Sequence, residues 1–221
     1  TDLASRDIEL LGVDDPAQLD LTASDMANIS AGFESLTIGR SDGSGLLLVS
    51  GDLIFLSDAE LRMPAQGGII RSTRPIRGSD GTRITITGPG TTFETAGGII
   101  TRGGQIVIND GVRLLDNSLF DTTDAGTFAA GAQVSINGRI NSEPAAGHGL
   151  VFRAGAAAVA LLGEIGTGLD GALGFVEVNA AGGVAIDGGI IRTLGTQIYN
   201  APASFGNGTT FASSGGDVTF N

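Results

Sequence analysis

The chain has 221 residues and a formal net charge of −12, with 24 acidic side chains against 12 arginines and no lysine, which excludes nucleic acid and an anionic membrane as main partners. Glycine (37 residues) is more than twice as frequent as the roughly 7% of ordinary globular proteins. Scarce proline and 41% hydrophobic residues nevertheless exclude a disordered linker, and the lack of a three-residue glycine period excludes collagen. Cysteine is absent, which excludes thiol nucleophiles and cysteine metal sites, and no apolar run reaches the roughly 18 residues of a membrane-spanning helix.

The hydrophobic content comes mainly from small and branched aliphatic side chains, because aromatic residues make up only 5% of the chain. Such side chains suit a narrow core in which successive layers stack at the spacing of neighbouring strands, about 4.8 Å. Since the chain has one Tyr and no Trp, we expect no exposed aromatic cluster on its surface.

The first predicted element is a short helix near residues 22–29. Thr22 followed by Asp25 forms the pattern of a capping box, and good helix formers come after it. An alternating stretch from Phe33 to Arg40 then predicts a strand. We therefore expect one or two helical turns that interrupt an otherwise β-rich chain.

A Gly-Gly-Ile-Ile motif recurs along the sequence at residues 67–70, 97–100 and 188–191. The first offset is 30 residues and the second is 91, close to three times the first. A recurrence of this kind indicates a solenoid or another repeat architecture. It predicts repeat units near residues 67–96, 97–187 and 188–221.

Several segments of four to six residues alternate between apolar and polar side chains, as a strand with one buried face does. They lie at residues 84–87, 105–109, 133–137, 175–179, 183–187 and 217–221. Pairs such as Asn137-Gly138 and Asp187-Gly188 follow some of them. Because Asn, Asp and Gly tolerate left-handed backbone, we expect that conformation at these corners.

The spacing of the turns is irregular, which favours a coil of short strands over a series of hairpins. The sequence therefore predicts an all-β fold, a parallel β-helix (β-solenoid) that forms one elongated segment over residues 1–221. A rung takes roughly 20 to 30 residues in such a fold, so we expect about eight to ten rungs. An antiparallel β-sandwich is the alternative.

Parts of the sequence resemble repeat blocks of bacterial filamentous-haemagglutinin-type exoproteins. The resemblance extends over most of residues 20–221, and the segments that carry it are Leu21–Ser30, Leu36–Gly45, Thr193–Asn200, Phe205–Phe211 and Gly215–Asn221. It implies a right-handed β-helix, export by a Gram-negative cell, and adhesion or scaffolding at the surface. The family's secretion domain is not recognisable, so the resemblance implies an internal stalk segment.

Few residues offer catalytic chemistry. His148 is the only histidine and lies between glycines, which is typical of a solvated loop. Asp14-Asp15 is the only adjacent acidic pair, and Asp121 and Asp124 lie close in sequence. Carbohydrate enzymes of this fold class use clustered carboxylates together with aromatic subsites. We therefore expect no enzyme.

Three aspartates in glycine-rich turns, Asp42, Asp80 and Asp170, are weak candidates for Ca²⁺ ligands. Oxygen-rich turns suit this cation, although no calcium-binding nonapeptide recurs in the sequence. Asp-Gly turns are common without any ion, so we expect at most weak calcium binding and no other cofactor.

Four arginines, Arg71, Arg74, Arg77 and Arg83, lie within thirteen residues of an otherwise acidic chain. Guanidinium groups make forked contacts with anions, so these residues are candidates for a patch that binds an acidic or sulfated glycan. The alternative is a solvated loop whose charge Asp80 balances.

Together these observations predict a non-catalytic β-helix stalk that acts in adhesion or presentation. The resemblance implies that it is secreted to or exposed at the surface of a Gram-negative bacterium. The alternative is a self-assembling structural subunit of a cell-surface layer or filament. Expected partners are further copies of the chain or neighbouring solenoid segments, and a surface glycan or matrix ligand. We expect no nucleic-acid partner and no direct insertion into a membrane.

Overall fold

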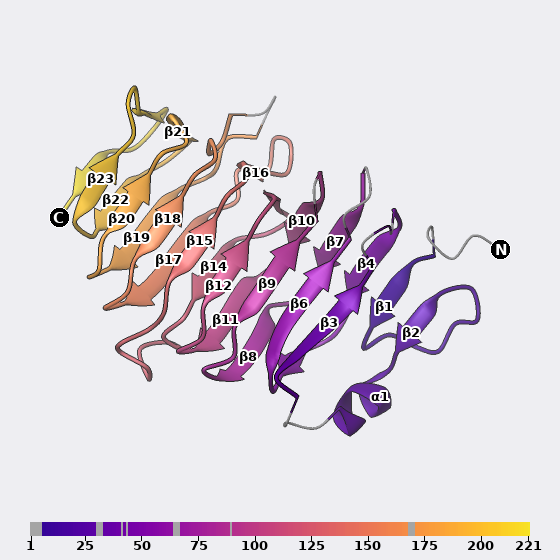
Figure 1. The fold of residues 1–221 in the computed structure, drawn as a ribbon. Coiled ribbons are helices and arrows are strands. Elements are labelled where there is room, and N and C mark those ends of the chain that lie inside the picture. Colours follow the sequence, from indigo (N-terminus) through magenta and orange to yellow (C-terminus); the bar gives the residue numbers. More distant parts are fainter. Residues whose placement is uncertain are drawn as a thin grey trace.

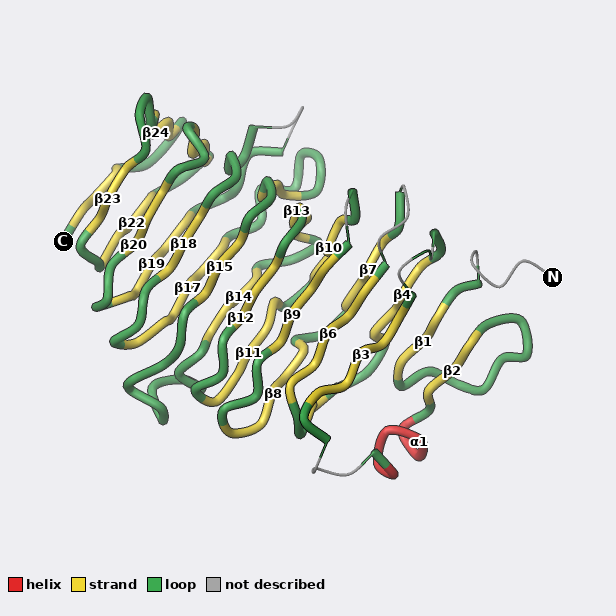
Figure 2. Tube along the Cα trace, viewed as in Figure 1, coloured by secondary structure: helices red, strands yellow, loops and turns green. Residues whose placement is uncertain are grey.

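A computed structural model describes residues 6–29, 33–40, 42, 44–63, 67–88, 90–167 and 171–221. The described part contains twenty-five short strands and one helix, α1 (Ala23–Asn28). Figure 1 shows the strands stacked side by side along a rod, with the two termini at opposite ends. In Figure 2 the strands alternate with turns along the whole rod, and the helix lies beside its N-terminal end.

The strands form three long faces, and after the first two strands, which share a face, successive strands of the chain pass from one face to the next. In spatial order from the C-terminal side, the first sheet contains β16 (Ile140–Ser142), β13 (Gly111–Leu114), β10 (Thr92–Thr95), β7 (Ile69–Ser72), β4 (Leu46–Val49), β1 (Ile8–Leu10) and β2 (Leu19–Leu21). The second sheet contains β25 (Val218–Phe220), β22 (Gln197–Asn200), β19 (Val176–Ala180), β17 (Leu150–Gly155), β14 (Ser118–Asp121), β11 (Gly98–Arg102), β8 (Ile76–Asp80) and β5 (Ile54–Phe55). The third sheet contains β23 (Ala203–Phe205), β20 (Val184–Ile186), β18 (Val159–Leu161), β15 (Val134–Ile136), β12 (Ile106–Ile108), β9 (Ile84–Thr87), β6 (Asp58–Arg62) and β3 (Ser35–Gly39).

The first sheet continues towards the C-terminal end through single bridges. Ile140 bridges to Ile165, and Ile165 bridges to Ile191 in β21 (Ile190–Thr193). β21 then pairs with β24 (Thr210–Ser213), the last strand on this face.

Every strand pairs in parallel, and apart from the consecutive strands β1 and β2 each pair joins strands on neighbouring turns. In the first sheet, for example, Ile70 pairs with Phe93, which pairs with Val112. The fold is therefore a parallel β-solenoid of about eight turns, and the coil in Figure 1 is right-handed. The predicted β-helix is confirmed, and the antiparallel β-sandwich is wrong.

The core consists of columns of branched aliphatic side chains, as their alternation in sequence predicted. On the third sheet, Ile84, Ile106, Val134, Val159 and Val184 are in register on five successive rungs, and each is at most 2% exposed. Burying one such side chain contributes about 1.5–3 kcal/mol relative to leaving it in water. Because each side chain packs on its equivalents above and below, the rungs stabilise one another.

The glycines at one line of corners are required for a reason that the sequence did not indicate. Gly138, Gly163 and Gly188 lie above one another between the third and first sheets, and none has the predicted left-handed backbone. A Cβ atom on Gly163 would lie 2.1 Å from the carbonyl oxygen of Gly138, and one on Gly188 would lie 2.0 Å from that of Gly163. Close approach of successive rungs is therefore what excludes a side chain here.

The predicted repeat units are longer than the rungs that the chain forms. The recurring Gly-Gly-Ile-Ile motif precedes β7 and β21 on the first face, but at residues 97–100 it leads into β11 on the second face. Side chains in equivalent positions on neighbouring rungs, such as Ser72 and Thr95, are 23 residues apart. The motif thus marks a corner followed by a strand, and this combination occurs on more than one face.

The helix begins with the predicted capping box. The backbone N–H of Asp25 donates to Thr22 Oγ1 (3.3 Å), and the backbone N–H of Thr22 donates to Asp25 Oδ2 (2.9 Å). The Thr22 hydroxyl also donates to this carboxylate, and these bonds hold the pKa of Asp25 below its usual value. The short helix predicted near residues 22–29 is therefore confirmed.

Candidate functional site

The four arginines of the predicted glycan patch lie on successive faces of one rung. Arg71 is in β7 on the first sheet, Arg77 is in β8 on the second, and Arg83 directly precedes β9 on the third. Arg74 lies in the turn between β7 and β8. Because a rung at this height takes 23 residues, thirteen residues go more than halfway around it. Proximity in sequence therefore does not gather these side chains on one face.

Two of these arginines are held by carboxylates. Arg71 forms an ion pair of 2.6 Å with Glu94 on the next rung, and Arg113 on the rung beyond pairs with the same carboxylate. The Glu94 side chain is only 1% exposed. Arg83 pairs with Asp58 at 3.5 Å, whereas within the described residues Arg74 and Arg77 form no ion pair. Arg74 and Arg77 are thus the two members of the predicted patch that remain available to a ligand.

The calcium candidates do not come together in the described part of the chain. Asp42 accepts two hydrogen bonds of 2.9 Å from Arg40, which holds the pKa of this carboxyl below its usual value. Asp80 forms an ion pair of 2.9 Å with Arg102, and Asp170 lies outside the described residues. Among the described residues, no group of three or more His, Cys, Asp or Glu side chains could hold a metal ion.

Two of the carboxylates considered for catalysis, Asp121 and Asp124, are held by other residues. Asp121 is buried and accepts hydrogen bonds from the backbone N–H and hydroxyl of Thr123, both at 2.6 Å, and from the backbone N–H of Ala125 at 3.0 Å. Asp124 pairs with Arg102 at 3.1 Å. His148, which we expected in a solvated loop, is half-buried, and its Nε2 atom has no partner among the described residues.

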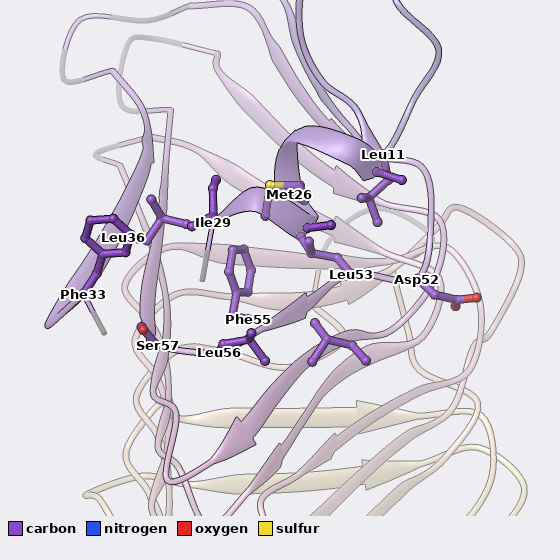
Figure 3. Close-up of a pocket in the computed structure, with 13 residues that line it drawn as sticks. Leu11, Met26, Ile29, Phe33, Leu36, Asp52, Leu53, Phe55, Leu56 and Ser57 are labelled. Atoms are coloured by element: carbon purple, nitrogen blue, oxygen red, sulfur yellow. The ribbon is translucent and has the colours of Figure 1, made fainter. Parts of the chain in front are cut away.

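An apolar cavity of about 360 Å³ lies between the helix and the first strand of the second sheet. Figure 3 shows Met26 and Ile29 of the helix segment facing Leu53 and Phe55 across it, with Asp52 at the edge. The cavity occupies the place where a further second-sheet strand would continue the stack. No local sequence signal marks the cavity, because its apolar run Leu53-Ile54-Phe55-Leu56 has an equivalent in β4, Leu46–Val49.

An exposed aromatic cluster, which the sequence did not predict, covers the opposite end of the rod. Phe205, Phe211 and Phe220 come from the last strand of each face, and Phe205 and Phe220 are 47% and 45% exposed. Their ring centroids lie 5.2–5.4 Å apart in edge-to-face arrangements, and Tyr199 stacks beneath Phe220 at 4.8 Å. The expectation of no such cluster was wrong, because it considered only Trp and Tyr.

No protein-family model, no curated protein and no solved structure matches the chain. In the described part of the chain, no helix has the length and hydropathy needed to cross a membrane.

Proposed function

We propose that the chain is a non-catalytic β-solenoid stalk, exported to the surface of a Gram-negative cell, where it acts in adhesion or presentation. The observation that carries this proposal is the uninterrupted stacking of about eight rungs into a rod whose ends are the N- and C-terminal parts of the chain. Such a rod holds whatever is attached to one end at a fixed position relative to the other. The sequence resemblance to filamentous-haemagglutinin-type exoproteins supports export.

The outer faces are consistent with a stalk that needs no ligand to remain folded. Ion pairs and amide ladders connect side chains on neighbouring rungs, as in the column of Arg71, Glu94 and Arg113. On the second sheet, Asn200 donates to Asn179 at 2.8 Å across adjacent rungs. These groups add side-chain contacts between rungs to the hydrogen bonds of the backbone.

The proposal is tested by displaying the chain on a Gram-negative host through an unrelated anchor and passing the cells over immobilised glycans and matrix proteins. We expect retention on at least one surface, with the mass of the immobilised ligand unchanged. Cells that display the core variant Ile106→Asp at the same level serve as the control. Retention no better than that of this control contradicts the adhesive function, and a change in ligand mass contradicts the non-catalytic one.

The same assay addresses the predicted acidic-glycan ligand. We expect the double substitution Arg74→Ala and Arg77→Ala to reduce retention on acidic glycans. Arg83→Ala is the matched control, because Asp58 already holds this guanidinium. Equal retention by all variants would remove the glycan role of these arginines.

A second function, self-assembly as a structural subunit of a cell-surface layer or filament, is favoured by a different observation. At the C-terminal end of the described chain, Phe205 and Phe220 are 47% and 45% exposed, and both pack edge-to-face on the partly buried ring of Phe211. Exposed apolar patches of this kind are typical of surfaces that bind another protein.

A further inference from the structure

A groove of about 420 Å³ lies on the side of the rod, at the corner where the chain leaves the second sheet for the third. Three polar side chains on successive strands of the second sheet line it: Arg153 in β17, Asn179 in β19 and Asn200 in β22. Arg153 is in register with Asn179, and Asn179 with Asn200. Each of these strands has a paired neighbour on both sides, so the groove does not depend on either end of the chain.

The long loop between β14 and β15 supplies a further part of the lining, namely Thr123, Ala125, Gly126 and Ala129. The base of this loop is closed by Thr122, whose hydroxyl donates to the carbonyl oxygen of Ala132 at 2.8 Å and accepts from the N–H of Ala132 at 2.9 Å. A compact surface loop whose ends meet in this way is an Ω-loop, and such loops frequently carry functional sites. The loop makes a hollow where the stacked strands alone would form an open face.

Contacts with neighbouring segments hold the loop in one conformation. Arg102 stacks on the Phe128 ring, 5.0 Å from its centroid, and pairs with Asp124 at 3.1 Å. The buried Asp121 accepts a hydrogen bond of 3.0 Å from the backbone N–H of Ala125. Asp124 and Ala125 have left-handed backbone, with φ of 47° and 57°, which side chains other than glycine adopt only when the surroundings enforce it. The groove is therefore preorganised, and a ligand does not have to order it.

The lining residues carry one positive charge and no negative charge, in a chain whose net charge is −12. The Arg153 side chain is 46% exposed, and its contact with Asp121 is 4.0 Å, too long for a hydrogen bond. Among the described residues nothing accepts a hydrogen bond from this guanidinium. The other nearby carboxylates are engaged, Asp124 in an ion pair and Glu177 by a hydrogen bond of 2.9 Å from Asn179. The groove thus offers a fork of unpaired donors, which suits a carboxylate.

Two amides continue this column of donors. Asn200 donates one N–H to the side-chain oxygen of Asn179 at 2.8 Å, and Asn179 donates one to Glu177. Each amide nitrogen carries two hydrogens, and the second one has no acceptor within the described part of the chain. Amide donors that follow the guanidinium at strand spacing, about 4.8 Å, suit a ligand that bears hydroxyl groups beside its carboxylate.

The geometry favours a sugar over a peptide. Extended peptides are bound mainly by adding a strand to an open sheet edge, and β17, β19 and β22 have both edges paired. The remaining lining residues are small, Ala and Gly, so the groove has no deep apolar pocket for a peptide side chain. Its volume lies within the usual range of small-ligand sites, about 300–1,000 Å³.

We propose that this groove binds a carboxylated sugar residue of an acidic glycan, with the sugar carboxylate on Arg153 and its hydroxyl groups on the amides of Asn179 and Asn200. The inference rests on adhesion, the first of the proposed functions. It gives that function a binding site separate from Arg74 and Arg77.

The first test titrates the intact purified chain with tetragalacturonate and, separately, with sialyllactose, and follows the side-chain signals by nuclear magnetic resonance. The two probes carry the carboxylate on a uronic acid and on a sialic acid, so they distinguish the source of the sugar. We expect the signals of the Arg153 guanidinium and of the Asn179 and Asn200 amides to shift with at least one probe. The methyl ester of that probe keeps the hydroxyl groups without the charge, and should bind about tenfold more weakly.

The second test uses two substitutions that act on the groove in different ways. Arg153→Gln keeps an amide donor and removes the charge, whereas Ala181→Glu adds a carboxylate at an exposed position of the lining. We expect each to weaken binding by about tenfold or more, with an unchanged circular dichroism spectrum. Arg139→Gln is the matched control, because Arg139 is an exposed arginine that pairs with Glu164 outside the groove, and its affinity should equal that of the unmodified chain.

The outcomes separate this site from adhesion itself. Groove signals that stay unshifted with both probes overturn the site, and so does equal binding by Arg153→Gln and Arg139→Gln. Cells that display the chain and are retained equally well with Arg153→Gln and Ala181→Glu overturn the site but leave adhesion standing. Binding in the groove of the purified chain without retention of the cells supports the site and contradicts adhesion.

Discussion

At the stacked corners, the absence of a Cβ atom on glycine is what allows neighbouring rungs to approach each other. The Cβ position of Gly163 is taken by the carbonyl group of Gly138, so a side chain there must push two rungs apart. At Gly111, by contrast, the nearest atom to an added Cβ is 3.5 Å away, which is ordinary contact. The same residue type is thus required at one corner and replaceable at another.

We predict that Gly163→Ala lowers the free energy of unfolding by about 1–3 kcal/mol, the usual cost of overpacking. Gly111→Ala, which has open space and no left-handed backbone, should change it by less than about 0.5 kcal/mol. Urea denaturation of both variants checks the prediction. Equal effects would mean that the corner does not depend on close approach.

The buried carboxylate of Glu94 is predicted to matter more than other acidic groups on the outer faces. Glu94→Gln removes ion pairs to arginines on both neighbouring rungs, and should destabilise the chain by about 1–3 kcal/mol. The control Glu60→Gln loses a pair to Arg62 on its own strand with a 27% exposed carboxylate, so we expect at most about 1 kcal/mol. The denaturation midpoints of the two variants, measured at low and high salt, test this prediction. A larger loss for Glu60→Gln would contradict the account of this column.

Asp110 is predicted to lower stability at neutral pH. Burial raises the pKa of this carboxyl, while the backbone N–H of Gly88 donates to it at 2.8 Å. Because the pKa of Asp110 is higher in the folded chain than in the unfolded chain, ionisation of this carboxyl lowers the stability of the fold. The loss disappears as the pH falls below the unfolded pKa of about 3.9. Asp110→Asn keeps an oxygen acceptor and should raise the melting temperature at pH 7 but not near pH 3. Melting curves of both proteins between pH 3 and pH 7 test this prediction. An equal gain in melting temperature at both pH values would exclude an effect of the charge.

At the scale of elements, the position of the helix was predictable and its role was not. The capping box marks where α1 begins, because it is a pattern of residues close in sequence. That α1 faces Leu53 and Phe55 across the apolar cavity depends on how distant segments of the chain are placed, which no local pattern contains.

We predict that Thr22→Ala frays α1 with a local loss of about 1 kcal/mol. Amide exchange should then quicken at residues 23–28 and in β5, which the helix covers, while β15 and β18 stay protected. The same fraying should occur in acid, because the pKa of Asp25 is lower in the folded chain than in the unfolded chain. The stability that its carboxylate contributes is therefore present above the unfolded pKa and is lost as the pH falls through the folded pKa. Exchange that is unchanged at residues 23–28 would show that the cap does not hold the helix.

The strands themselves were largely predictable, because alternation of apolar side chains reports burial directly. The segments predicted at 84–87, 105–109 and 133–137 correspond to β9, β12 and β15. The repeat was harder to recognise, because loops of different length separate equivalent residues on successive rungs, 23 residues for Ser72 and Thr95 but 28 for Asn109 and Asn137. Without a constant period, the sequence revealed corners and strands but not rungs.

The same property explains the scattered arginines. Spacing in sequence translates into position around the rod only when the length of the rung is known. Arg71 and Arg77 are six positions apart and lie on different sheets, whereas Arg71 and Arg113 share one carboxylate across two turns. Candidate sites on a solenoid are therefore recognised reliably only after the register is established.

At the scale of the whole molecule, one continuous core extends from Ile8 to Ala201, and each rung contacts only its neighbours. Stability is then a sum of terms for single rungs and for contacts between adjacent rungs. The two ends differ, since the N-terminal one is partly covered by α1 and the C-terminal one presents aromatic rings.

The central claim, a rod of stacked and interchangeable rungs, is tested most directly by removing one rung in register. Val134 is in register with Val159, so deletion of residues 134–158 should let β12 pair with β18. Spin labels at Thr37→Cys and Ala185→Cys lie on one column of the third sheet, six strand spacings or about 29 Å apart. We predict that the deletion shortens this distance by about 5 Å and preserves cooperative melting, whereas deletion of residues 134–145 abolishes folding. An unchanged or broadly distributed distance after the in-register deletion would contradict the solenoid.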